Sequence, residues 1–231
     1  MTSYCGAPPH PYDWVERWNF DPVLLAALAA TAVVAVRSQH PRVALASVAV
    51  LAVAFVSPLC ALTVALFSAR AVHHVLLVAA AAPLAALAFP GRGSKHLGIA
   101  FVASTATLWA WHLPALYDRA LVDTTIYWLM QLSLLGTSTW LWRELIAAPP
   151  MTASMFSVLA MAQMGMLGAL LTFARAPLYA AHTASTLPWG LEQVADQQLA
   201  GLVMWVPGVI PYALATALIA RRVWTRTTET A

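Results

Sequence analysis

The sequence predicts an all-α polytopic membrane protein, a bundle of seven transmembrane helices, and two observations lead to this class. Of 231 residues, 61% are hydrophobic and 9% are charged, which leaves too little polar surface to cover a water-soluble globule of this size. The uncharged stretches are also long, and about 20 apolar residues span the hydrocarbon layer of a bilayer. These stretches are continuous in Ala, Leu and Val rather than alternating, which disfavours a closed β-barrel. We therefore expect helices surrounded by lipid.

Seven uncharged runs define the expected helices in chain order. They extend over residues 22–36, 43–69, 71–91, 97–117, 124–142, 145–174 and 197–220. The first run has only 15 residues, so we expect Trp14, Trp18 and Phe20 to extend it as an interfacial collar, or the helix to tilt little in a locally thinned membrane. The expected organisation is an outer N-terminal arm over 1–21, a seven-helix domain over 22–224 and an inner tail over 225–231.

Two of these runs carry helix-breaking or polar signals. Pro58 ends the second helix, and the apolar stretch that follows it is expected either to lie along the membrane surface or to begin the third helix. Asp196 is a candidate cap for a last helix that begins near Leu202, while Gln197 and Gln198 are candidates for hydrogen bonds to other helices. Polar groups in a membrane are costly unless paired, so these three are either bundle contacts or part of a site.

The basic residues predict the orientation of the bundle. With the N-terminus outside and the C-terminus inside, the inner connections hold eight basic residues and the outer ones hold four, which satisfies the positive-inside bias. The inner set is Arg37, Arg42, Arg92, Lys95, Arg143, Arg221, Arg222 and Arg226, and the outer set is Arg17, Arg70, Arg119 and Arg175. The net charge of +3 follows from this topology and gives no reason to expect a nucleic-acid partner.

In this topology five of the seven histidines gather at the outer face, namely His10, His73, His74, His112 and His182. Neutral imidazole is a common ligand for copper, zinc and iron, and desolvation keeps its lone pair available. Adjacent residues on a helix point about 100° apart, so we expect one of His73 and His74, but not both, to face the bundle. The alternative for any of these side chains is a hydrogen bond to a neighbouring helix.

Cys5 and Cys60 lie on the same outer side, and they leave several interpretations open. A thiolate suits monovalent copper, which makes Cys60 a candidate ligand beside the histidines. The two cysteines can instead form a disulfide, which an oxidising compartment allows, or stay unpaired. Histidines on facing helices can also ligate haem iron. We do not expect an enzyme, because no nucleophile stands at a recognisable spacing from a partnering base and acid.

Four stretches of the sequence carry a family resemblance. They are RAVHHVLLVAAAAP at 70–83, WHLPALYDRAL at 111–121, PLY at 177–179 and DQQLAGLVMWVP at 196–207. Together they resemble the bacterial caa3-type cytochrome c oxidase assembly factors, which are seven-helix membrane proteins. The resemblance implies a protein of the bacterial inner membrane that acts in oxidase assembly, with cytochrome c oxidase subunits as partners and copper as the metal.

The resemblance also assigns site residues. The family's histidine before a Leu-Leu run matches His74, and its His-x-Pro sequence matches His112. The family's polar segment matches Asp196, Gln197 and Gln198. The resemblance therefore implies a two-histidine core for the metal, with the Asp-Gln-Gln segment as a polar site near it.

At one position the chain departs from the family pattern. Many members have a further histidine four residues before the first, where this chain has Arg70, and an arginine repels a cation. His73 and His182 are the candidates to replace that ligand, and Cys60 is a further possible ligand. The predicted function is to bind copper near the outer face and deliver it to an oxidase subunit. The alternatives are a haem-binding electron carrier and a cofactor-free scaffold for oxidase subunits.

Overall fold

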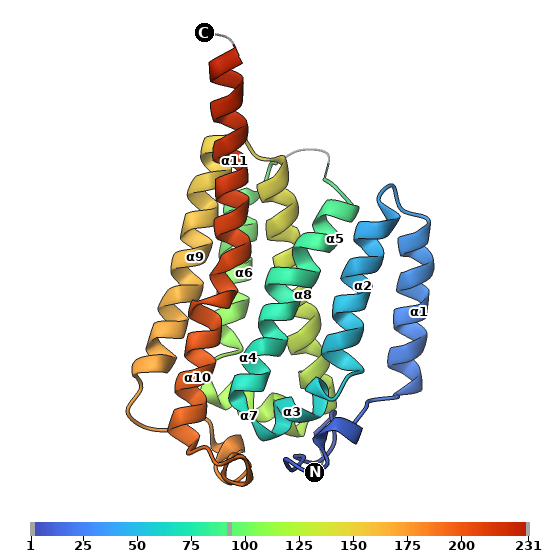
Figure 1. Cartoon of the computed structure of the whole chain (residues 1–231), viewed down its shortest axis with the longest axis vertical. Helices are drawn as coiled ribbons and strands as arrows, with labels where there is room; N and C mark the ends of the chain where they lie inside the picture. Colours follow the sequence, from blue (N-terminus) through green and yellow to red (C-terminus); the bar gives the residue numbers. More distant parts are fainter. Residues whose placement is uncertain (1–2, 92–93, 230–231) are drawn as a thin grey trace.

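The computed structural model describes residues 3–91 and 94–229, with side chains as far as Leu218 and at Arg221, and the described chain is all-α. The longer helices run side by side along the long axis (Figure 1). The N-terminal arm and the C-terminal end of the last helix lie at opposite ends of the bundle (Figure 1), as an odd number of crossings requires. Which end faces outside stays a prediction.

The helices follow one another with short connections. In chain order they are α1 (Pro22–Val36), α2 (Pro41–Phe55), α3 (Leu59–Ala65), α4 (Phe67–Val75), α5 (Ala82–Ala88), α6 (Leu97–Ala110), α7 (Pro114–Val122), α8 (Thr124–Ala147), α9 (Pro150–Phe173), α10 (Gln193–Trp205) and α11 (Ile210–Glu229). The π-helix η2 (Leu76–Ala81) joins α4 to α5, and single 3-10 turns form η1 (Trp14–Glu16), η3 (Ala180–His182), η4 (Leu187–Trp189) and η5 (Pro207–Val209). The expected tail over 225–231 lies partly outside the described residues, and α11 continues to Glu229.

Three helical stretches in the described chain are long and apolar enough to cross a membrane, namely Phe67–Ala88, Pro150–Phe173 and Gln193–Leu218. Two more arise if the pair α2 and α3, bent by 44°, and the pair α6 and α7, bent by 73°, each form one span. Helix α1 is apolar but has only 15 residues. The structure thus fits a membrane protein with three to five candidate spans, and the count of seven crossings stays a prediction.

Several helix boundaries differ from those expected. Helix α2 ends at Phe55, and the stretch after Pro58 forms the separate helix α3 instead of beginning the third long helix. The last long helix begins at Gln193 rather than near Leu202, so Asp196 lies inside α10 and does not cap it. Pro58 directly precedes α3, since a proline suits the start of a helix but not its interior, whereas α10 begins at Gln193 without a proline.

Arg70 is also placed differently. It was counted in an outer connection because a charge normally ends a membrane run, but it lies within α4 and is fully buried. The outer basic residues therefore number three rather than four, and the charge bias that predicted the orientation becomes larger. Arg70 thus places a cation in the interior of the bundle.

The helix changes from α-helical to π-helical hydrogen bonding just after the histidine pair of α4, and becomes α-helical again in α5. Pro83 stands in the first turn of α5, where its ring and missing N–H disturb the preceding turn, and the π-helix η2 lies immediately before it. Backbone carbonyls of this segment accept side-chain hydrogen bonds: Trp142 Nε1 donates to Val78 at 2.9 Å, and Ser47 Oγ donates to Ala81 at 2.9 Å. The segment is therefore held from both α8 and α2.

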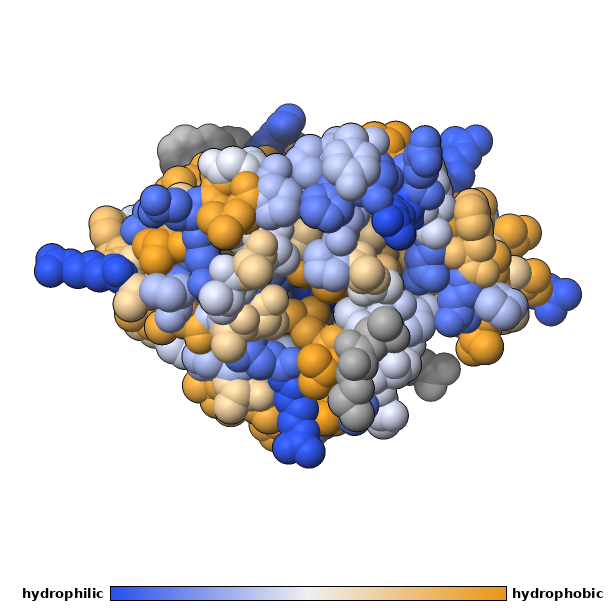
Figure 2. All heavy atoms as spheres, turned by 90° about the horizontal axis from the view of Figure 1, so that it is seen from below, coloured by the Kyte–Doolittle hydropathy of each residue, from blue (hydrophilic) through white to orange (hydrophobic). Residues whose placement is uncertain are grey.

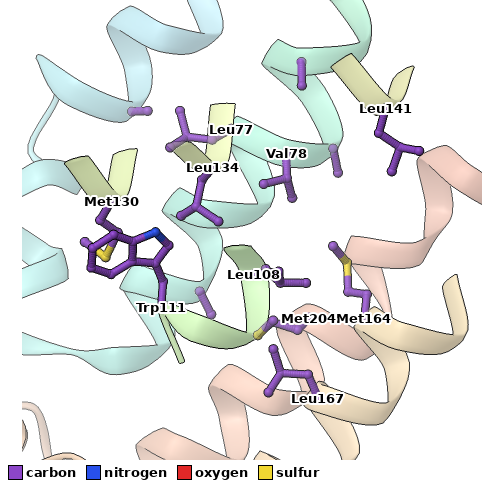
Figure 3. Packing of buried hydrophobic residues seen from close by; sticks show 14 of the residues in the cluster. Leu77, Val78, Leu108, Trp111, Met130, Leu134, Leu141, Met164, Leu167 and Met204 are labelled. Atoms are coloured by element: carbon purple, nitrogen blue, oxygen red, sulfur yellow. The ribbon is translucent and has the colours of Figure 1, made fainter. Parts of the chain in front are cut away.

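Buried apolar side chains from α4 through α10 form one continuous core. Figure 3 shows Leu77 of η2 beside Leu134 of α8, and Met164 of α9 beside Met204 of α10. Helices α9 and α10 pack against each other, and α10 also packs against α4. The end of the molecule that carries the N-terminal arm, seen in Figure 2, shows hydrophilic residues over much of its face. Helices α3 and α7 lie at this end (Figure 1).

Candidate functional site

The two histidines of α4 lie in its last turn, and both are buried. His73 is 0% exposed and His74 is 1% exposed, so both are enclosed by the bundle, whereas one of them was expected to face it. The ring of His73 packs edge-on against Phe55 of α2, with 4.8 Å between centroids. The centroids of His73 and His74 are 6.1 Å apart. The two rings have different neighbours, as expected for adjacent residues on a helix. Both are nevertheless buried, because other helices pack around α4 on more than one side.

His74 faces His112, with 5.6 Å between the ring centroids and an interplanar angle of 80°. His112 follows the end of α6 and is 6% exposed. Its Nδ1 donates a hydrogen bond to the Leu108 carbonyl at 2.7 Å, and because a carbonyl only accepts, this bond places the proton on Nδ1. The Nε2 atom of His112 therefore carries a lone pair. Both ring nitrogens of His74 lack a hydrogen-bond partner among the described residues.

His182 is buried in the 174–192 connection, but its ring nitrogens are already used. Nε2 lies 2.8 Å from the Tyr117 hydroxyl, and Nδ1 lies 3.3 Å from the Ala65 carbonyl. Burial, together with the charge of Arg70, lowers the pKa of His182 to about 4, against the opposing effect of the Ala65 hydrogen bond. The ring is therefore neutral near pH 7 and occupied by protein groups, which leaves no lone pair for a metal.

Cys60 is not available as a ligand in this structure. It forms a disulfide with Cys5, and a disulfide sulfur is not the thiolate that was predicted to bind copper. The disulfide, one of the alternatives that the sequence left open, is thus the state of the two cysteines. It joins the N-terminal arm to α3. His10, the remaining outer histidine, is exposed in that arm and stacks on Tyr12.

Asp196 caps α4 rather than its own helix. Its carboxylate is 0% exposed and accepts hydrogen bonds from the backbone amides of Phe67, at 2.6 Å, and Ser68, at 3.2 Å, and from the Ser68 hydroxyl. Leu66, which precedes α4, provides no side-chain cap. A carboxylate is favourable at a helix N-terminus because the free amides and the helix dipole attract negative charge. Asp196 therefore fixes the helix that carries His73 and His74.

The two glutamines that follow hold the 174–192 connection by its backbone, and they do not bond to other helices as was expected. Gln197 accepts from the Leu178 amide at 2.8 Å and donates to the Ala176 carbonyl at 3.4 Å. Gln198 donates to the Ala174 carbonyl at 3.2 Å. The Asp-Gln-Gln segment is thus a structural clamp at the histidine end of the bundle.

Tyr179 links this connection to the histidine pair, and no role for it is predicted from the sequence on its own. Its hydroxyl donates to the His112 carbonyl at 2.9 Å, and Gln193 donates to the Tyr179 carbonyl. Burial raises the pKa of Tyr179, so the hydroxyl keeps its proton at neutral pH. The PLY stretch at 177–179 includes this tyrosine and carries part of the family resemblance. That stretch is the sequence signal that pointed to Tyr179.

The histidine pair is a two-ligand arrangement. No group of three or more His, Cys, Asp or Glu side chains within the described parts of the chain is arranged to hold a metal ion. Of the predicted ligands, the structure brings the rings of His74 and His112 together edge to face and leaves His73 beside His74. The donor atoms of His182 and Cys60 are engaged elsewhere. Two buried imidazoles with free nitrogens can bind a cation that accepts low coordination.

Comparison with known proteins gives one match. A family described as cytochrome c oxidase caa3 assembly factor matches residues 91–226, which is more than half of the chain. The matched part contains His112, His182 and the Asp-Gln-Gln segment, and it begins after α4 with His73 and His74. No curated protein and no solved structure matches the chain.

Proposed function

The chain belongs to the cytochrome c oxidase caa3 assembly factor family, and from this premise we propose that it binds copper between His74 and His112 and delivers it to an oxidase subunit during assembly. The role is that of a metal carrier rather than an enzyme. The proposed location is the inner membrane of a bacterium, with the histidine end of the bundle at the periplasmic face. The partners are the oxidase subunits that receive copper.

The observation that carries the proposal is the buried pair of imidazoles with unused nitrogens. Burying a polar nitrogen without a partner is unfavourable, so nitrogens of this kind indicate a ligand that completes them. Imidazole suits copper, and the proton of His112 is held on Nδ1 by the Leu108 carbonyl, which leaves Nε2 for a metal. Bound copper would be the cargo, held by His74 and His112.

Low coordination suits a protein that must release its metal. A closed four-ligand cage holds an ion permanently, whereas a site with two protein ligands leaves positions for the ligands of an acceptor. His73 is the nearest additional donor, because its ring nitrogens also lack partners and its centroid is 6.1 Å from that of His74. We leave His182 and Cys60 out of the proposed set, since their donor atoms are engaged elsewhere.

The test is the copper content of the purified full-length protein loaded with copper under reducing conditions. We expect about one copper per chain in the wild type and a loss of most of it in His74→Ala and in His112→Ala. His40→Ala is the matched control, because His40 is exposed at the start of α2. It should retain wild-type copper. Unchanged copper in both site variants would overturn the copper site.

Two further readouts separate the alternatives. A visible spectrum with a strong Soret band would instead assign the pair to haem iron. Measuring copper and haem in the membrane oxidase of cells that carry His74→Ala tests delivery, and loss of copper with haem intact is the expected result. If those cells assemble an oxidase with its full copper content, a cofactor-free scaffold is the better description.

A further inference from the structure

Arg70 is a cation in the interior of the bundle, and the groups around it do not balance its charge. The side chain is 0% exposed, and a guanidinium stays protonated in proteins. Burying an unpaired charge costs several kcal/mol even after relaxation. Within the described residues the one ion pair is between Arg17 and Asp13, in the N-terminal arm. Arg70 therefore requires a negative partner that the described side chains do not supply.

The contacts of Arg70 leave two of its donor atoms free. Its Nη2 reaches the Thr63 carbonyl at 3.4 Å, which is a long hydrogen bond. Its guanidinium carbon lies 5.4 Å from the centroid of the Tyr127 ring, a cation–π contact. Its Nε and Nη1 have no hydrogen-bond partner among the described residues. The carboxylate of Asp196 is engaged with the first turn of α4 and forms no ion pair with Arg70.

Two more buried side chains with unpartnered polar atoms stand on these two helices, one turn from Arg70 on α4 and one turn from Tyr127 on α8. His73 follows Arg70 by three residues on α4, so both are on one side of that helix, and neither ring nitrogen of His73 has a partner. Gln131 lies one turn after Tyr127 on α8; it is 1% exposed, and both atoms of its amide group lack partners. Buried polar groups are nearly always hydrogen-bonded, so several orphans around one buried cation indicate a ligand common to them.

We propose that Arg70, with Gln131 and His73, binds a small monovalent anion between α4 and α8. The anion is small because the atoms that would contact it are fully buried, and monovalent because one fixed positive charge faces it. Halides and carboxylates share the chemistry that this set of N–H donors recognises. The copper proposal uses His73 only as an additional donor beside His74 and His112, so the anion site does not depend on whether that pair binds a metal.

The test uses the metal-free full-length protein in detergent, with thermal unfolding followed in sodium gluconate and in sodium chloride at equal ionic strength. We expect chloride to raise the Tm saturably in the wild type, because a ligand of the folded state stabilises it by mass action. Sodium formate is run in parallel, and stabilisation by formate but not by chloride would identify a carboxylate as the ligand. Equal Tm values in gluconate, chloride and formate would overturn the anion site.

Two substitutions locate the anion. Arg70→Met should abolish the response to chloride and should be at least as stable as the wild type in gluconate, because it removes the uncompensated charge. Arg175→Met is the matched control, since Arg175 is exposed, and it should keep the full response. A response to chloride that survives in Arg70→Met would assign the effect to another site.

A direct measurement covers the case in which Arg70→Met does not fold. Equilibrium binding of radioactive chloride to the wild type should give about one ion per chain. Gln131→Leu should weaken it about fivefold, as expected for the loss of one neutral hydrogen bond. Absence of saturable binding to the wild type would overturn the proposal on its own. Because no copper is present, neither result depends on the histidine pair.

Discussion

His182 illustrates how a single buried histidine makes stability depend on pH. Its two hydrogen bonds, with Tyr117 and with the Ala65 carbonyl, require one nitrogen to accept and the other to donate, which is the neutral ring. The pKa of about 4 in the folded protein lies below the usual value of 6.5 in an unfolded chain. Between these two values the unfolded state binds more protons than the folded state, so acid favours unfolding.

We predict that His182 contributes to stability fully above pH 6.5 and that this contribution is lost as the pH falls towards 4. The maximum effect is about 3 kcal/mol, from the difference between the two pKa values. Comparing the free energy of unfolding of the wild type with that of His182→Gln from pH 7.5 to pH 4 isolates it. The variant should lose less stability across this window. Parallel pH profiles would show that His182 does not titrate with folding.

For individual residues, the sequence predicted part of the candidate site but not all of it. His74 and His112 were predicted as a pair, and they face each other. Cys60 was open between ligand and disulfide, because spacing along the chain does not say whether Cys5 reaches it. Arg70 was assigned to a connection because a charge is usually excluded from a membrane helix. Only the structure shows that this charge is inside the bundle, beside unpartnered groups.

Among the elements, α9 and α10 pack with their backbones close together at two glycines. A Cβ atom added to Gly168 would lie 2.7 Å from the Gly201 carbonyl oxygen, and one added to Gly201 would meet the backbone and side chain of Thr172. Small residues allow two membrane helices to pack with their backbones close together. This contact supports α10, the helix whose Asp196 caps α4.

We predict opposite effects for two glycine substitutions in long helices. Gly201→Ala should lower the free energy of unfolding by about 2 kcal/mol, because the added methyl group meets backbone atoms that cannot move away. Gly136→Ala, in α8, should raise it by about 0.5 to 1 kcal/mol, since its new Cβ meets nothing within 4 Å and alanine favours a helix. Thermal unfolding of both variants in detergent measures the difference. Equal stability of the two variants would contradict the close contact.

The runs of apolar residues predicted whole helices better than their interruptions. The expected helix over 22–36 coincides with α1, and the run over 145–174 contains α9. The run over 97–117 is divided into α6 and α7, with a 73° bend at the residues around His112. A run of uncharged residues reports solvation by lipid, but it does not report where packing against neighbours bends the backbone. The π-helix η2 is likewise an interruption of a helix within an apolar run, and no pattern in that run predicted it.

Across the whole molecule, the N-terminal arm closes over the histidine end of the bundle. Its Cys5 is joined to Cys60 of α3, and the ring of Tyr4 stacks on Tyr127 at 4.9 Å. Asn19 donates to the Phe55 carbonyl at 3.1 Å. The arm therefore connects α8 with the consecutive helices α2 and α3, which are far from it along the chain.

We predict that the disulfide stabilises this closure substantially. It closes a loop with a sequence separation of 55 residues, for which restriction of the unfolded chain amounts to about 4 kcal/mol. The double variant Cys5→Ser with Cys60→Ser should unfold at a lower temperature than the wild type. Dithiothreitol should lower the Tm of the wild type to the same extent and leave that of the variant unchanged. A wild-type Tm that is insensitive to dithiothreitol would contradict the prediction.

The cap that Asp196 provides to α4 sets an order of events during biosynthesis. The carboxylate lies 129 positions after Phe67 and 128 after Ser68, so the ribosome makes α4 long before it makes the residue that completes its first turn. Until α10 is inserted, the amides at the start of α4 have no such acceptor. The helix bearing His73 and His74 is therefore finished by a residue translated 128 positions after Ser68, and a chain truncated before Asp196 lacks the contact that fixes it.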